Sequence, residues 1–158
     1  MYQTEKEFVK VVSMKLKKQG ADTMLVETAG TTVGCPDMFV QAAGEDWWIE
    51  FKNIRTVKDS TKLQVPWRPG QQAWALNYRR AHTQAHSQEY KAIKCSWTFI
   101  AAADMIWLVR MDKVYADNVV LAVDSSNLVL DKQQFNNINL VKFLYERSYI
   151  LVPSVKDL

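Results

Sequence analysis

The chain has 158 residues, of which 48% are hydrophobic and 23% charged. This is the size and composition of one compact domain with a real core, which excludes a disordered chain and a fibrous protein. The longest apolar run is interrupted by Asp104, short of the ~20 residues that cross a membrane, and the N-terminus lacks an apolar signal segment, so we expect a cytoplasmic protein with no membrane partner.

The charge is unevenly distributed along the chain. The formal net charge is only +3, but residues 52–94 contain nine basic and two acidic residues, while the rest of the chain is net acidic. A basic stretch of this kind can face a polyanion such as DNA, or it can be an ordinary solvated surface. The two cysteines, Cys35 and Cys95, are too few for a disulfide framework, and we expect free thiols.

The first half of the chain predicts one helix and three strands. Apolar residues at helical spacing indicate a helix over residues 5–18, with Thr4 as its N-cap and Gly20 at its end. Three strands are expected next, over residues 23–28, 37–43 and 47–54. Residues 44–46 are expected to form the hairpin turn between the last two strands.

The second half predicts a loop, two helices and four strands. Residues 55–70 are polar, basic and contain two prolines, which indicates a mobile loop. A helix is expected over residues 71–88, with its inward face formed by Ala73, Leu76 and Ala85. Further strands are expected over residues 96–103, 105–111, 119–123 and 128–130, and a helix over 138–147. The order predicts one α/β domain with a mixed central sheet flanked by helices.

The strand over residues 47–54 contains two of the candidate catalytic side chains. Strand alternation places Ile49 and Phe51 on one face and Glu50 and Lys52 on the other. A hairpin at Gly44 brings Asp37 close to Glu50, so two carboxylates and an ammonium group converge. Oxygen ligands of this kind suit Mg²⁺ or Mn²⁺, and Glu5 on the first helix is a candidate third carboxylate. The alternative is an amphipathic edge strand with a simple Glu–Lys pair.

These residues resemble a known nuclease superfamily. The segments Gly34-Cys35-Pro36-Asp37 and Glu50-Phe51-Lys52 resemble the PD-(D/E)xK motif. The lead-in 5–9 resembles the first helix of archaeal-type Holliday junction resolvases. Residues 48–52, together with 68–74, are similar to VRR-type nucleases, including small stand-alone ones of phages. The resemblance covers about residues 5–111.

The resemblance implies a fold and a division of the chain. The fold would be a restriction-endonuclease-like αβββαβ core with a mixed central sheet, over residues 1–111. Residues 112–158 would be a C-terminal addition packed on the same domain and a candidate dimerisation element. The apolar residues that could form such a contact, or simply pack on the sheet, are Tyr145, Tyr149, Ile150 and Leu151.

The resemblance also implies the roles of individual residues. Asp37 and Glu50 would bind the metal together with the backbone carbonyl of Phe51, and Glu5 would bind it directly or through water. Lys52 would orient the attacking water. The glutamine of the following helix is either Gln71 or Gln72, and the position of Trp74 favours Gln72.

The basic residues after this motif are candidate DNA contacts. They are interleaved with an aromatic residue that could stack on a base, and the set is Arg55, Lys58, Lys62, Trp67, Arg68, Arg79 and Arg80. The alternative is a solvated basic face on which Trp67 packs inward. Trp47, Trp97 and Trp107 are expected in the core, whereas Trp48 shares the face of Glu50. No Walker A loop and no GxGxxG segment is present, so no nucleotide cofactor is expected.

The sequence therefore predicts an Mg²⁺-dependent or Mn²⁺-dependent DNA endonuclease that is selective for branched DNA. It would act in the cytoplasm of a bacterium or, for a phage protein, of its host. A nicking enzyme, an exonuclease and a restriction-type enzyme stay open as other nuclease modes. A module on the same fold that binds DNA structures without catalysis is the alternative from another class.

Overall fold

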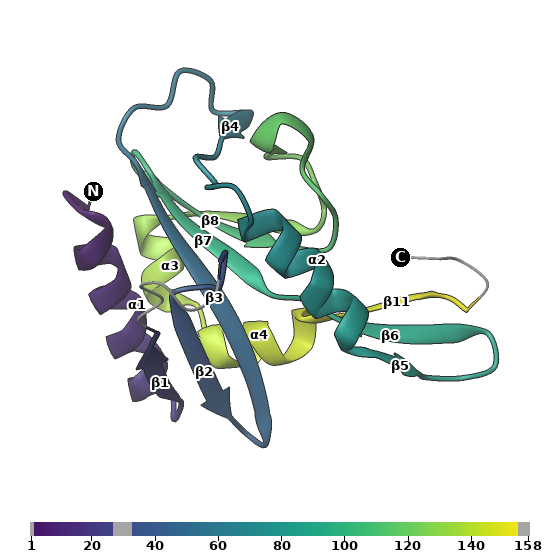
Figure 1. The fold of residues 1–158 in the computed structure, drawn as a ribbon. Helices are drawn as coiled ribbons and strands as arrows, with labels where there is room; N and C mark the ends of the chain where they lie inside the picture. Colours follow the sequence, from purple (N-terminus) through teal and green to yellow (C-terminus); the bar gives the residue numbers. More distant parts are fainter. Residues whose placement is uncertain (1, 27–32, 155–158) are drawn as a thin grey trace.

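The computed structural model describes residues 2–26 and 33–154 and has a mixed sheet at its centre (Figure 1). The sheet has six strands in the order β1-β2-β3-β7-β8-β10. Their bounds are β1 Asp22–Leu25, β2 Met38–Ala42, β3 Glu45–Ile54, β7 Trp97–Ala102, β8 Met105–Arg110 and β10 Asn127–Asp131. The β3–β7 pair is parallel and the other pairs are antiparallel. The predicted α/β fold with a mixed, helix-flanked sheet is confirmed.

Helices cover both faces of this sheet and create two separate cores. On one face, α1 (Glu5–Lys18), α3 (Lys132–Asn137) and α4 (Leu140–Arg147) bury a core that includes Phe8, Phe51 and Phe99. On the other face, α2 (Gln71–Ala81) and the β4–β9 pair bury a second core with Trp67, Trp107 and Tyr115. Strands β7 and β8, which lie between the two cores, are mainly apolar on both faces, as expected for a doubly covered sheet.

The first helix forms where the sequence predicts it. The side chain of Thr4 accepts a hydrogen bond from the Glu7 N–H at 3.1 Å and so caps the helix. Phe8, Val12 and Leu16, which share one side of α1 by their four-residue spacing, are fully buried against the sheet. The helix therefore has a fixed position, and its N-terminus is held near the end of β3.

The β2–β3 hairpin is also confirmed, with a shorter turn than predicted. Ala43 and Gly44 alone form the turn, with φ angles of 54° and 76°. Two consecutive left-handed residues form the type I′ geometry, which matches the twist of the two strands. The register places Met38 opposite Ile49.

Two predictions in the middle of the chain are wrong. Residues 55–70 are not simply a mobile loop, because β4 (Lys62–Gln64) pairs with β9 (Val119–Leu121) and Leu63, Val65 and Trp67 are buried. The second helix ends at Ala81, where the Thr83 hydroxyl donates to the Arg79 carbonyl. Its buried residues are Ala75, Tyr78 and Arg79, not Ala73, Leu76 and Ala85.

The chain after α2 forms an arm beside the main sheet. Strands β5 (Thr83–Ala85) and β6 (Tyr90–Lys94) form a hairpin that projects from the body (Figure 1). Strand β11 (Tyr149–Pro153) adds to β6 from the C-terminal end. The part of residues 112–158 that the structure describes therefore contributes a strand to each of the three sheets: β9 pairs with β4, β10 is in the central sheet and β11 pairs with β6. No helix among the described residues is long and apolar enough to span a membrane, and Cys35 and Cys95 are free.

Candidate functional site

Three charged side chains meet where β2 begins beside β3. Ile49 and Phe51 point into the core under α1, whereas Glu50 and Lys52 point to the opposite face and are each only 6% exposed. Lys52 Nζ lies 3.4 Å from Glu50 Oε2. Strand β3 lies between β2 and β7, so the alternative of an exposed edge strand is wrong. Two ionisable groups are thus held in the interior, which is costly without compensating partners.

Asp37 is fixed by the strand next to it. Its Oδ2 accepts a hydrogen bond from the Phe51 N–H at 2.9 Å, and its backbone carbonyl accepts one from Val26. Regular pairing of β2 with β3 ends at Met38 opposite Ile49, so the side chain of Asp37 replaces the next backbone partner. In an antiparallel ladder the N–H and C=O of one residue point to the same neighbour. The Phe51 carbonyl therefore faces the same side as Asp37.

Glu50 has an unusual environment. Burial, and secondly the charge of Asp37, raise its pKa to about 8, while Lys52 acts in the opposite direction. Its Oε2 accepts from Lys52 and from Gln71, but its Oε1 is buried without a hydrogen-bond partner among the described residues. Such an unsatisfied buried oxygen is uncommon, and it is the natural place for a cation.

Glu5 is close enough to Asp37 and Lys52 for their charges to act on it. It is at the start of α1, and burial together with the charge of Asp37 raises its pKa, against the influence of Lys52 and Arg68. No group of three His, Cys, Asp or Glu side chains within residues 2–26 and 33–154 is placed to hold a metal ion. A metal here would need backbone or water oxygens in addition to Asp37 and Glu50, which is usual for Mg²⁺.

The helix glutamine that reaches the site is Gln71. Its Nε2 donates to Glu50 Oε2 at 2.9 Å, and its Oε1 accepts from the Arg68 N–H at 2.8 Å, which fixes the orientation of the amide. Gln72, which the position of Trp74 favours, points away from Glu50 and forms hydrogen bonds with Tyr115 and Asn118. Adjacent helical residues are about 100° apart around the axis, so only one of the two can face the sheet.

A close backbone contact sets the start of α2 against the Asp37 loop. A Cβ atom on Gly34 would lie 2.1 Å from the Gly70 carbonyl oxygen, so only glycine fits at position 34. Beside this contact is a surface pocket of about 310 Å³. It is lined by Val33, Gly34, Cys35, Asp37, Arg68, Pro69 and Gln71. Arg68 is thus the candidate DNA contact that the structure places beside the carboxylates.

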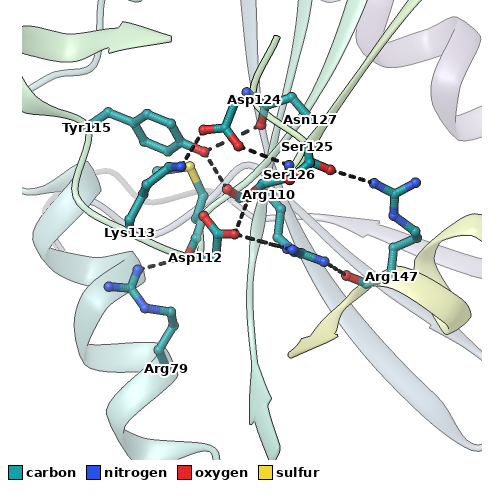
Figure 2. Close-up of polar contacts among 11 residues, drawn as sticks. Arg79, Arg110, Asp112, Lys113, Tyr115, Asp124, Ser125, Ser126, Asn127 and Arg147 are labelled. Carbon is teal, nitrogen blue, oxygen red and sulfur yellow. Dashed lines mark hydrogen bonds and ion pairs between the residues drawn. The ribbon is translucent and has the colours of Figure 1, made fainter. Parts of the chain in front are cut away.

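Two of the predicted DNA contacts are wrong because their side chains are buried. Trp67 is 6% exposed, donates to Thr98 Oγ1 at 3.2 Å and stacks on Tyr115. Arg79 is 5% exposed and donates to the Met111 carbonyl at 2.7 Å (Figure 2). The alternation of buried Leu63, Val65 and Trp67 with polar residues is the signal that could have identified an inward-facing strand.

The other predicted DNA contacts are on the surface. Arg55 is exposed, and its guanidinium donates to the Gln3 carbonyl just before α1. The remaining exposed members are Lys58, Lys62, Arg68 and Arg80.

The tryptophans divide into buried and half-buried residues as the sequence predicts. Trp47, Trp97 and Trp107 are buried. Trp48 is half-buried on the face of Glu50, with its ring centroid 4.8 Å from that of Phe39 and 5.6 Å from that of Trp74.

Comparison with known proteins gives a similarity of fold. No protein-family model matches the sequence, and no curated protein matches it. Among solved structures, the chain is similar to Hjc, a Holliday junction resolvase from the archaeal hyperthermophile Archaeoglobus fulgidus. The match covers 88% of this chain and 98% of that chain, with 13% identity and a TM-score of 0.49. At this level the similarity does not bear on function, which must be inferred from the geometry of the site.

Proposed function

We propose that the protein is a divalent-metal-dependent DNA nuclease that hydrolyses phosphodiester bonds in branched DNA. The observation that carries the proposal is the convergence of Asp37 with the buried Glu50 and Lys52, together with a Glu50 oxygen that has no hydrogen-bond partner within residues 2–26 and 33–154. The order of these residues along the chain, which resembles the PD-(D/E)xK motif, supports the same assignment.

The donor set fits Mg²⁺ or Mn²⁺. Asp37 and Glu50 would bind the ion through carboxylate oxygens, the Phe51 carbonyl would add a third oxygen, and Glu5 would act through water. Oε1 of Glu50, which lacks a partner in the described part of the chain, supports this fit, because a cation satisfies a buried carboxylate better than a neutral donor does. When bound, the ion supplies charge neutralisation and lowers the pKa of its water.

Side chains of the protein would position the water, the carboxylate ligand and the DNA. The Lys52 ammonium holds the attacking water in line and offsets the charge that develops on the phosphate. The Gln71 amide holds Glu50 by donating to its Oε2. Arg68 at the rim of the pocket binds a phosphate next to the scissile one, and its fixed fork suits phosphate oxygens.

The test is cleavage of three labelled DNAs by the wild type and by Asp37→Asn. The DNAs are a linear duplex, a single strand and an immobile four-way junction, each with Mg²⁺, Mn²⁺ or EDTA. We expect metal-dependent cleavage of the junction by the wild type and its loss in Asp37→Asn, because the substitution removes a charged ligand without changing the shape of the side chain.

The pattern of cuts separates the alternatives. Paired symmetric nicks confined to the junction require two active sites and therefore a homodimer. Equal cutting of all three DNAs would indicate a general nuclease, and cuts only at ends an exonuclease. Tight metal-independent binding with no cleavage, unchanged in Asp37→Asn, would replace the nuclease by a module that binds DNA structures.

Arg68→Ala is expected to weaken DNA binding in the same way for all three DNAs. One lost phosphate contact reduces the slope of log K against log salt concentration by about 0.9 on duplex DNA. Fluorescence anisotropy at several salt concentrations, with Ca²⁺ in place of Mg²⁺, measures this slope. Lys142→Ala is the matched control, because Lys142 is an exposed cation on α4 that lies 3.9 Å from Glu146. An unchanged slope in Arg68→Ala would remove this residue from the interface.

A further inference from the structure

The start of α2 is attached to the C-terminal part of the chain by Gln72. Its Oε1 accepts from the Tyr115 N–H at 2.6 Å, and its Nε2 donates to the Tyr115 carbonyl at 3.0 Å and to Asn118 Oδ1 at 2.7 Å. One half-buried side chain thus makes three hydrogen bonds to a single turn, residues 115–118. Asn118 in addition donates to the Trp67 carbonyl, which links the turn to the segment before α2.

This turn is itself held in place by a polar network (Figure 2). The Tyr115 hydroxyl donates to the Arg110 carbonyl at 2.7 Å, and Lys113 forms an ion pair with Asp124. Arg110 also pairs with Asp112, and it donates to the carbonyl of Arg147 at the end of α4. The turn is therefore a fixed point to which a helix can be attached.

A second attachment lies two helical turns further along α2. Arg79 donates to the Met111 carbonyl, and residues seven apart lie on the same side of a helix. Gln72 and Arg79 therefore fix one side of α2 to residues 111–118. Gln71 lies about 100° around the helix from Gln72, on the side that faces Glu50.

We infer that Gln72 is a positioning residue. It sets the rotation of α2 about its axis and its position along that axis, so that the Gln71 amide can donate to Glu50. The Gln71 amide reaches Glu50 across a single hydrogen bond of 2.9 Å. A small rotation of α2 would break this bond while leaving the helix itself intact. The segment 115–118 thereby acts on the site without contacting it. The consequence for cleavage rests on the proposed function.

The kinetic test is a double-mutant cycle with Gln71→Ala, Gln72→Met and the double variant. Methionine keeps the length of the side chain and removes all three hydrogen bonds. We expect Gln72→Met to lower the single-turnover cleavage rate about 10-fold, with DNA affinity unchanged. The double variant should be no slower than Gln71→Ala, because both substitutions act through one contact. Independent, multiplying losses would overturn the inference.

Gln64→Met is the matched control. Gln64 donates to the Asp117 carbonyl of the same turn at 2.6 Å, but it lies on β4 and has no bond to α2. We expect its cleavage rate to equal that of the wild type. An equal loss in Gln64→Met and Gln72→Met would show that general loosening of the turn is responsible, and would overturn the positioning role.

A crystal structure of Gln72→Met tests the inference apart from any activity. We expect Gln71 Nε2 and Glu50 Oε2 to separate beyond hydrogen-bond distance, with the fold otherwise unchanged. Retention of the 2.9 Å contact would overturn the inference even if the protein is a nuclease. Separation of the two atoms would support it even if the proposed function fails.

Discussion

Lys52→Met is expected to reduce cleavage of branched DNA by about 10²–10³-fold, the usual effect of removing one group that stabilises a developing oxyanion. The Lys52 ammonium is buried beside Glu50 on the face that holds the two carboxylates. An attacking water or a phosphate oxygen at this position would therefore lie within its reach. Methionine keeps the aliphatic stem in place, so the loss reports the charge and not the packing.

The control for this substitution is a second buried lysine. Lys94 is 5% exposed and pairs with Asp46 at 2.9 Å and Glu45 at 3.5 Å, far along the hairpin from Asp37. Lys94→Met should lower the melting temperature, because it breaks the ion pairs that the buried Lys94 makes with two partly exposed carboxylates, and it should keep the wild-type rate. Single-turnover cleavage with excess protein, with thermal unfolding in parallel, measures both effects. Equal rates in the two variants would contradict the role of Lys52.

The residues of the site that lie on neighbouring strands could be predicted from the sequence. The alternation of Ile49, Glu50, Phe51 and Lys52 is a local property of a strand, and a tight turn at Gly44 determines which residue of the preceding strand lies opposite. Both the polar face of β3 and the approach of Asp37 follow from these two facts. No tertiary information is needed for either.

The parts that depend on distant contacts could not be predicted. The position of Trp74 in the local pattern favours Gln72, whereas the contacts of α2 with Glu50 and with Tyr115 place Gln71 beside the carboxylates. Trp67 and Arg79 are buried because Thr98 and the Met111 carbonyl, each more than 30 residues away in sequence, accept their hydrogen bonds. Amphipathic residues of this kind look like surface residues until their partners are known.

In metal-free protein, the free energy of unfolding is expected to decrease as the pH rises, and Glu50→Gln is expected to remove most of this decrease. The folded-state pKa of Glu50 is about 8, raised by burial and by Asp37, whereas an unfolded glutamate titrates near pH ~4.3. Between these values the folded protein holds a proton that the unfolded chain releases. The contribution of Glu50 to the free energy of unfolding is therefore fully present below pH ~4 and is lost as the pH rises to about 8, by an amount on the order of 5 kcal/mol.

Urea unfolding in EDTA at several pH values between these limits measures the effect. The difference between wild type and Glu50→Gln isolates Glu50, because the two proteins share every other titratable group. Glu146→Gln is the matched control, since Glu146 is exposed on α4 and its loss should leave the pH dependence of the wild type intact.

Metal then gives the decisive comparison. A divalent ion between Asp37 and Glu50 offsets both causes of the raised pKa, so Mn²⁺ should restore the stability of the wild type at pH 8. It should have little effect on Glu50→Gln, which has lost one of the two carboxylates. If Mn²⁺ stabilises both proteins equally, the ion binds elsewhere. If the wild type without metal shows no loss of stability as the pH rises, Lys52 alone compensates the charge of Glu50. The two residues would then form a structural ion pair, and the metal site would be contradicted.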